Sequence, residues 1–285
     1  MTMIQNILFP VDFSPSCVAM TPLVKKAAAV FGAKVSLLHV VEIVSSGFEL
    51  MARPVTEVVE EHEYLARERL NSFLAPDFPV DECPRVLRLG DPAMRIAQVA
   101  REARFDIIVM PTHAGTFRRM LLGSTTAKVL NDADCPVLTT EHAETITPRP
   151  LEHREWVCAT GLQQDSERVL RYAGVLAESV HANLQVIHAI PAAEQGIDFQ
   201  FDLEERAQSA ERQAAHSRVE ELLRNVGLAA PVHIAVGPVK DALIETARRL
   251  QADAVLIGRS AQAGVRLRDL TYAIVRDAPC PVLSV

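Results

Sequence analysis

The sequence predicts an α/β protein with two five-stranded parallel sheets, each flanked by helices on both faces. Two observations support this prediction. Short aliphatic runs alternate along the chain with longer amphipathic segments, which is the pattern of βαβ units around a buried parallel sheet. The second half of the chain also repeats the first half at an offset close to half of its 285 residues. We therefore expect one α/β module that is present twice.

The repeat is carried by pairs of matching segments. The clearest pair is DADCPVL at Asp132–Leu138 and DAPCPVL at Asp277–Leu283, which places Cys135 and Cys280 145 residues apart. The other pairs are Asp106–Met110 with Asp253–Ile257, Gly90–Pro92 with Gly237–Val239, and Leu37–Val40 with Val186–Ala189. A polar stretch with two prolines, residues 141–150, is typical of a linker. The predicted modules are residues 1–141 and 152–285.

In the first half, five aliphatic runs predict the strands. They are Ile4–Val11, Lys34–Val41, Arg85–Leu89, Asp106–Met110 and Pro136–Thr140. The helices between them are expected at about Ser16–Phe31, Thr56–Phe73, Asp91–Ala103 and Ser124–Asn131. Three of these helices have start signals, namely Ser14-Pro15, Asp91-Pro92 and Gly123-Ser124.

The second half repeats this order. Its strands are expected at Glu155–Ala159, Asn183–His188, Pro231–Val236, Asp253–Gly258 and Pro281–Val285. Its helices are expected to begin near Gln163, Asp202, Pro238 and Leu267. Ligands of such sheets bind beyond the carboxyl ends of the strands, where the strand order reverses. Any chemistry is therefore expected at that edge.

Composition excludes several classes of function. The chain is 49% hydrophobic and 23% charged, which argues against disorder, and 29 basic against 36 acidic residues argue against nucleic acid as a partner. No apolar run reaches the roughly 20 residues that span a bilayer, and the first residues lack the features of a secretion signal. The five cysteines are widely spaced, so neither a disulfide framework nor a metal site is expected. We expect a cytoplasmic protein without a membrane segment.

Polar residues at the predicted strand ends of the first half mark a candidate site. Pro10, Val11 and Asp12 follow the first strand, Val41 ends the second, and residues 110–115 end the fourth. Gly123, Ser124 and Thr125 then open a helix, where backbone N–H groups, hydroxyls and the helix dipole suit an anion. Arg118 and Arg119 could add positive charge. The alternative is a purely structural role, in which Gly123-Ser124 only caps the helix.

Several of these segments match one known family. They are ILFPVDFS at Ile7–Ser14, MPTH at Met110–His113, LLGS at Leu121–Ser124, AKVL at Ala127–Leu130 and DCPV at Asp134–Val137. On these residues the chain resembles a tandem universal stress protein, and the resemblance extends over both halves. It implies modules with a Rossmann-like fold of the adenine-nucleotide alpha hydrolase type. It also implies association of the two modules as an internal pseudo-dimer, with a further homodimer left open.

The resemblance also implies an adenine-nucleotide site. ATP-binding members have an aspartate at the end of strand one, and a Gly-x-x-Gly followed by nine residues and Gly-Ser or Gly-Thr. Asp12 then takes the ribose side, Val41 packs near adenine, Thr112 and His113 line the pocket, and Gly123–Thr125 hold the phosphates. The full candidate set is Pro10, Val11, Asp12, Val41, Met110, Thr112, His113, Gly115, Gly123, Ser124 and Thr125.

The phosphate loop departs from the family pattern. Pro111 and Ala114 stand at the two early glycine positions, and only eight residues separate Ala114 from Gly123. Proline removes an N–H group and alanine tolerates positive φ less readily than glycine, although Gly115 could compensate. In the second half, Ala159–Gly161 replaces the aspartate motif and no Gly-Ser opens the last helix. We therefore expect the second module to be degenerate and mainly structural.

Three functions remain open. The first is a stress-response protein that binds ATP or another adenine nucleotide, with Mg²⁺ as an accompanying ion, and uses occupancy as a signal. The second is a scaffold without cofactor that acts through dimerisation and unknown protein partners. The third, at most slow ATP hydrolysis or adenylyl transfer, is disfavoured because the sequence offers no placed general base. His39 and His188, at equivalent strand positions, are expected to be packed or hydrogen-bonded rather than metal ligands.

Overall fold

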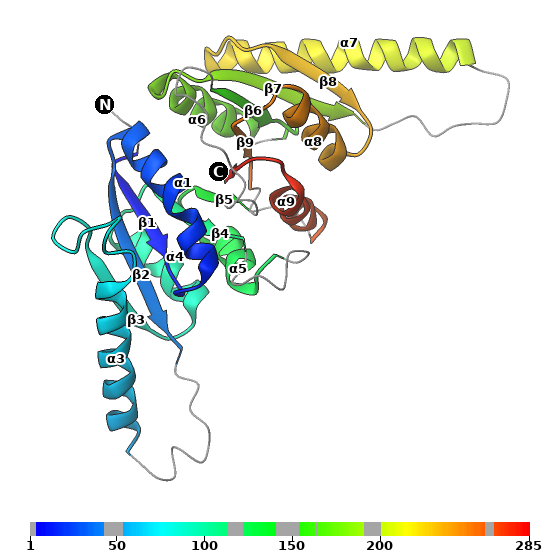
Figure 1. Cartoon of the computed structure of the whole chain (residues 1–285). Helices are drawn as coiled ribbons and strands as arrows, with labels where there is room; N and C mark the ends of the chain where they lie inside the picture. Colours follow the sequence, from blue (N-terminus) through cyan, green and yellow to red (C-terminus); the bar gives the residue numbers. More distant parts are fainter. Residues whose placement is uncertain are drawn as a thin grey trace. The chain divides into compact units, whose positions relative to one another are not determined.

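The computed structural model describes residues 4–42, 54–112, 122–140, 154–163, 165–190, 201–259 and 265–285, of which 201–207 and 265–268 are described by their backbone alone (Figure 1). The chain divides into two compact units, Met1–Thr145 and Ile146–Val285. Each unit is an α/β domain with a parallel sheet, as the sequence predicts.

The first unit has five parallel strands in the order β3-β2-β1-β4-β5. The strands are β1 Asn6–Pro10, β2 Lys34–Val41, β3 Arg85–Leu89, β4 Ile107–Pro111 and β5 Val137–Thr140. The helices are α1 Pro15–Phe31, α3 Val55–Ser72, α4 Pro92–Glu102 and α5 Ser124–Asp132. Each predicted element of this half is present, with ends that differ by no more than two residues.

The central strands are buried on both faces, as is usual in a parallel sheet whose helical crossovers cover both sides. Ile7, Leu8 and Phe9 of β1 are all fully buried, so both faces of the strand are covered. Right-handed crossovers place α1 and α3 on one face and α4 and α5 on the other, and α4 packs directly against α5. The chain runs outward from β1 to β3 and then crosses back to β4 beside β1. The strand order therefore reverses between β1 and β4, which is where ligands bind such sheets.

The second unit repeats this arrangement with the strand order β10-β9-β6-β7-β8. The strands are β6 Glu155–Ala159, β7 Asn183–Ile190, β8 Val232–Val236, β9 Ala254–Ile257 and β10 Val282–Ser284. The helices are α6 Ser166–Ser179, α7 Phe201–Val226, α8 Val239–Arg249 and α9 Val265–Asp277. The predicted start of α6 near Gln163 is wrong by three residues, because Gln163 N–H donates to Ser166 Oγ at 2.8 Å in a turn before the helix.

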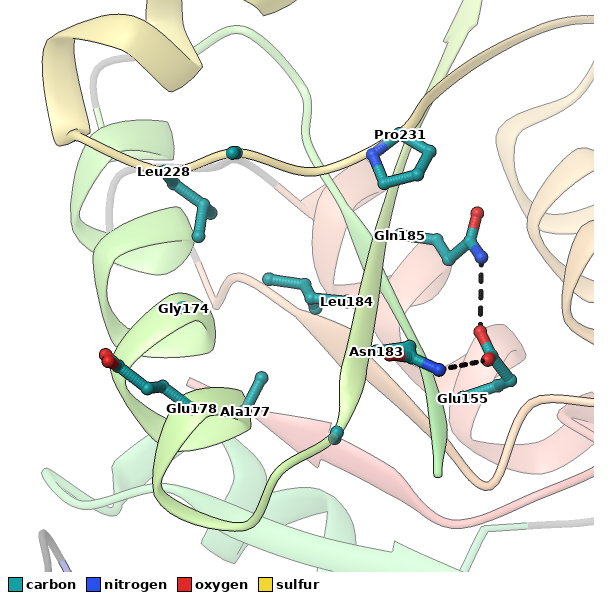
Figure 2. A pocket seen from close by; sticks show the side chains of 11 residues that line it. Glu155, Gly174, Ala177, Glu178, Asn183, Leu184, Gln185, Leu228 and Pro231 are labelled. Atoms are coloured by element: carbon teal, nitrogen blue, oxygen red, sulfur yellow. Dashed lines mark hydrogen bonds between the residues drawn. The ribbon is translucent and has the colours of Figure 1, made fainter. Parts of the chain in front are cut away.

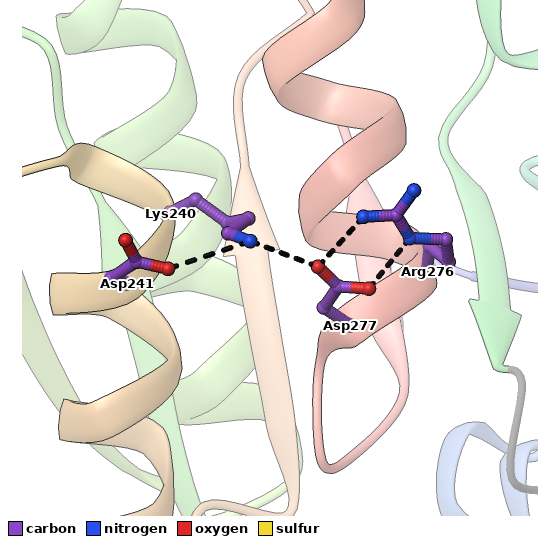
Figure 3. Close-up of polar contacts among 4 residues, drawn as sticks. All are labelled: Lys240, Asp241, Arg276 and Asp277. Atoms are coloured by element: carbon purple, nitrogen blue, oxygen red, sulfur yellow. Dashed lines mark hydrogen bonds and ion pairs between the residues drawn. The ribbon is translucent and has the colours of Figure 1, made fainter. Parts of the chain in front are cut away.

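Ion pairs connect neighbouring helices within each unit. In the second unit, Lys240 of α8 lies between Asp241 and Asp277, and its Nζ is 3.1 Å from Asp277 Oδ2 at the end of α9 (Figure 3). Hydrogen bonds from Arg276, together with Lys240, lower the pKa of Asp277 to about 2. In the first unit, Lys128 of α5 pairs with Asp91 before α4 at 3.1 Å. The Lys128–Asp91 pair is the more exposed of the two, and because water screens such a pair it orients the helix ends and adds little to the stability of the fold.

Among the described residues, none of the helices combines the length and the apolar composition needed to cross a membrane.

Candidate functional site

The loop after β1 places Asp12 at the carboxyl edge of the first sheet. Val11 is buried and its N–H donates to Leu38 O of β2 at 2.8 Å, which fixes the residue before Asp12. Asp12 is exposed, and its Oδ1 accepts hydrogen bonds from Ser14 N–H at 3.0 Å and from Cys17 Sγ at 3.1 Å. No described residue donates to Oδ2. One carboxylate oxygen thus anchors the side chain, and the other has no donor among the described residues.

The thiol of Cys17 is a protonated donor to Asp12. Burial, and next the negative charge of Asp12, raise the pKa of Cys17 to about 12. The thiol therefore stays neutral at physiological pH and does not act as a nucleophile.

Phe13, directly after Asp12, has a left-handed backbone with φ of 63°. This conformation costs a residue with a side chain roughly 1–2 kcal/mol. The ring is held by three neighbours: the His39 ring at 4.2 Å, the Phe73 ring edge-on at 5.2 Å, and the Arg69 guanidinium carbon at 4.4 Å above it. These contacts offset the backbone strain.

His39 is hydrogen-bonded, as the sequence predicts. Its Nδ1 lies 2.8 Å from Val11 O, and because a carbonyl only accepts, Nδ1 carries the proton. Burial is the main cause that lowers the pKa of His39, since the Val11 and Asp12 contributions that raise it are smaller and Arg69 lowers it further. The imidazole is thus a neutral donor that connects β2 to the loop after β1.

On the other side of the switch point, several donors near the end of β4 are used inside the protein. Thr112 is 2% exposed, and its hydroxyl donates to Thr140 O at 3.4 Å. Gly123 N–H donates to Thr112 O at 2.8 Å, and Thr126 Oγ1 donates to Pro111 O at 3.0 Å. These bonds tie the start of α5 to the end of β4.

Ser124 and Thr125 present the remaining donors at the start of α5. Gly123 is the N-cap residue and has an extended backbone, and as a glycine it has no side chain to cap the helix. The first N–H groups of a helix have no partner within it, so they point beyond the helix start, where two hydroxyls also lie. Ser124 is exposed and Thr125 is half-buried. This arrangement can bind an anion, with fewer donors than the sequence suggests because Gly123 N–H is already bonded.

The other candidate residues are placed by the strands. Pro10 pairs with Leu38, Val41 ends β2 and accepts a hydrogen bond from Gly90 N–H at 3.0 Å, and Met110 lies buried in β4. The topology therefore brings the ends of β1, β2 and β4 and the start of α5 to one edge. His113 and Gly115, with Ala114, Arg118 and Arg119, lie outside the described residues.

Sequence reasoning missed the support beneath Asp12. Phe13 stands within the matched ILFPVDFS segment, but Arg69 and Phe73 come from the end of α3 and the residue that follows it. Their contact with Phe13 joins positions far apart in the chain, and no local spacing signals it.

The same edge of the second unit keeps the loop but lacks the carboxylate. His188 Nδ1 lies 2.8 Å from Thr160 O, and Leu162 has a left-handed backbone with φ of 54°. Gly161 therefore stands where Asp12 stands in the first unit. A Cβ on Gly258, at the end of β9, would lie 2.9 Å from Val169 Cγ2, so α6 packs closely against this position.

A cavity of about 420 Å³ lies at the opposite, amino edge of the second sheet (Figure 2). Glu155 on its wall accepts hydrogen bonds from Asn183 Nδ2 at 2.8 Å and Gln185 Nε2 at 3.1 Å. His233 Nε2 continues the chain of bonds to Gln185 Oε1 at 2.7 Å. These polar groups satisfy one another, and they lie at the other end of the strands from the edge where the sequence places the ligand.

Within the described part of the chain, no group of three or more His, Cys, Asp or Glu side chains could hold a metal ion.

Comparison with known sequences gives consistent matches. The universal stress protein family model matches residues 3–140 and 154–285. A universal stress protein of Methanothermobacter thermautotrophicus is 34% identical over 83 residues, which are 29% of this chain and 57% of that protein. The universal stress protein in the QAH/OAS sulfhydrylase 3' region of Thermus aquaticus is 32% identical over 142 residues, 48% of this chain and 98% of the relative.

Solved structures show the same fold over the whole chain. A universal stress protein from Archaeoglobus fulgidus DSM 4304 has a TM-score of 0.73 at 20% identity, covering 98% of this chain and 97% of its own. A functionally unknown protein from Pseudomonas aeruginosa PAO1 has a TM-score of 0.61 at 20% identity, covering 99% and 92%. At these identities the similarity concerns the fold alone.

Proposed function

Because the chain belongs to the universal stress protein family, we propose that it is a stress-response protein whose first module binds an adenine nucleotide such as ATP as a signal. The observation that carries the proposal is Asp12, a carboxylate held by one oxygen with the other free among the described residues. It stands at the switch point of the sheet, where α/β proteins bind their ligands.

The proposed pose follows from the donors and acceptors at this edge. Asp12 Oδ2 can accept hydrogen bonds from ribose hydroxyls, and Val41 offers an apolar contact for adenine. Ser124 and Thr125 offer N–H groups and hydroxyls to a phosphate at the positive end of the α5 dipole. Mg²⁺ would accompany the phosphates. Pro10, Val11, Met110, Thr112 and Gly123 shape the walls, and His113 and Gly115 are proposed to join them.

A second candidate function is a nucleotide-free scaffold that acts through protein partners. It is favoured by the use of Gly123 N–H, Thr112 and Thr126 in bonds within the protein, and by Pro111 at the first glycine position. These features reduce the donors available to a triphosphate.

In either case the second module, residues 152–285, is proposed to be mainly structural and to pair with the first as an internal pseudo-dimer. A cytoplasmic location is part of the same proposal.

Replacement of Asp12 by asparagine (Asp12→Asn) tests nucleotide binding. The amide side chain keeps one oxygen as the acceptor for Ser14 and Cys17, so the fold is expected to be unchanged. It has an NH₂ group in place of the outward oxygen, so the acceptor for the ribose hydroxyls is lost. We expect ATP affinity, measured by calorimetry, to fall about tenfold or more. Asp165→Asn, in the equivalent region of the second unit, is the matched control and should bind ATP like the unmodified chain. No heat of binding at millimolar ATP in the unmodified chain would instead favour the scaffold.

A further inference from the structure

We infer that His39 is a positioning residue for Asp12, acting through Val11 and Phe13 on either side of it. The inference rests on the proposed function, because it assigns to His39 the task of holding Asp12 in the conformation that meets the nucleotide. It concerns a residue whose ring is already engaged by the protein and not by the proposed ligand.

The first link is the backbone before Asp12. Val11 donates its N–H to Leu38 O at 2.8 Å and accepts at its carbonyl from His39 Nδ1, also at 2.8 Å. Both polar groups of Val11 are therefore bound to β2. Because Val11 is buried, loss of His39 would leave its carbonyl without this donor and release the peptide that leads into Asp12.

The second link is the side chain after Asp12. The His39 ring is also the nearest of the rings around Phe13, at 4.2 Å, with Phe73 and Arg69 completing the enclosure. This enclosure packs the side chain of Phe13, whose backbone is left-handed, and so restrains the residue after Asp12. One imidazole thus restrains the residues on both sides of Asp12, and Ser14 and Cys17 then fix the carboxylate itself.

The second unit provides a natural comparison. His188 makes the same 2.8 Å bond to Thr160 O, before a loop that has Gly161 in place of the aspartate. Leu162 takes the left-handed position there, so an aromatic ring is not needed for the backbone to adopt it. The histidine is part of the loop architecture in both units, but only in the first unit does it support a carboxylate.

The test compares His39→Ala with His188→Ala, which removes the equivalent bond from the other unit. Two quantities are measured on the full chain: hydrogen exchange of the Ser14 amide, which donates to Asp12, and ATP affinity by calorimetry. His39→Ala should speed Ser14 exchange and weaken ATP binding by about tenfold each. His188→Ala should leave both unchanged.

Two further variants keep the inference testable if His39→Ala folds poorly. His39→Asn places an amide donor close to the position of Nδ1, so it should restore most of the Ser14 protection and ATP affinity. Phe13→Leu copies the second unit and should give an intermediate loss. Unchanged Ser14 exchange and ATP affinity in His39→Ala would overturn the inference. If the unmodified chain binds no ATP, the proposed function fails, whereas the Ser14 exchange of His39→Ala against His188→Ala still decides whether His39 positions Asp12.

Discussion

The carboxylate of Asp12 is oriented by two hydrogen bonds to a single oxygen. The Cys17 thiol donates to the same Oδ1 as Ser14 N–H, so Cys17 helps to orient the side chain. The sequence identifies Asp12 from its place after a strand. It does not reveal Cys17 as a partner, because a cysteine in the first turns of a helix is an ordinary buried residue.

Cysteine labelling tests whether Cys17 is buried and protonated in the fold, as its hydrogen bond to Asp12 requires. Burial raises the pKa of both Cys17 and Cys158 to about 12, so neither forms a thiolate at pH 8. We expect iodoacetamide to leave both unmodified in the folded chain and to label them in urea, as read by peptide mass spectrometry. Rapid labelling of folded Cys17 at pH 8 would contradict the burial that keeps its thiol protonated beside Asp12.

The lowered pKa values of two histidines predict how the free energy of unfolding depends on pH. Burial lowers the pKa of His39, which is near Asp12 and Arg69, and of His233, which is near Arg249. The unfolded chain, with a histidine pKa near 6.5, then binds more protons than the folded chain at acidic pH. The free energy of unfolding therefore has its full value at pH 7 and falls as the pH drops below about 6.5. Urea unfolding at pH 7 and pH 5.5 should show this loss. His39→Asn should show a smaller loss than the unmodified chain, and an equal loss would mean that His39 titrates normally in the fold.

At the scale of elements, the strands were predictable and the contacts between elements were not. The bounds of β2, β3 and β6 agree with the sequence prediction because each is a short aliphatic run between clear breaks. The start of α6 is different because a turn held by Ser166 delays the helix. Arg85 donates to Phe78 O at 2.5 Å and to Cys83 O, which holds the loop before β3, and such side-chain bonds to a loop leave no periodic signal.

Two glycines in the second unit should respond in opposite ways to alanine. A Cβ on Gly174, within α6, would lie 2.8 Å from the tip of Leu228, a half-buried side chain on the wall of the 420 Å³ cavity. Leu228 can move into that space, so the gain in helix propensity, about 1 kcal/mol, should make Gly174→Ala neutral or stabilising in urea unfolding.

Gly258→Ala has no such space. Its Cβ would lie 2.9 Å from Val169 Cγ2, and Val169 is a stiff, 3% exposed side chain. We expect a loss of about 1–3 kcal/mol in the free energy of unfolding, measured in urea. A Gly258→Ala variant as stable as Gly174→Ala would show that α6 does not pack as closely on the end of β9 as described.

At the scale of the whole molecule, the internal repeat is the feature that the sequence conveys best. Matched segments such as those around Cys135 and Cys280 are present in both halves because both units need the same buried strands. The two units also differ, in the lengths of α3 and α7 and at the candidate site, where the first unit has Asp12 and the second has Gly161. A shared fold is therefore compatible with different residues at the same edge of the two units.

Light scattering tests the proposed internal pseudo-dimer. If the two modules pair with each other, the 31.3 kDa chain has no need of a second copy and should elute as a monomer at micromolar concentration. A mass of twice this value, independent of dilution, would contradict this prediction and would show a homodimer, which the internal pseudo-dimer does not require.

Hydrogen exchange with and without ATP tests the central claim most directly, because it both detects binding and locates it. We predict that millimolar ATP slows exchange in residues 11–14 and 122–126, at the end of β1 and the start of α5, and leaves residues 159–163 of the second unit unchanged. The absence of protection at both first-unit segments, or protection confined to the second unit, would contradict the assignment of nucleotide binding to the first module.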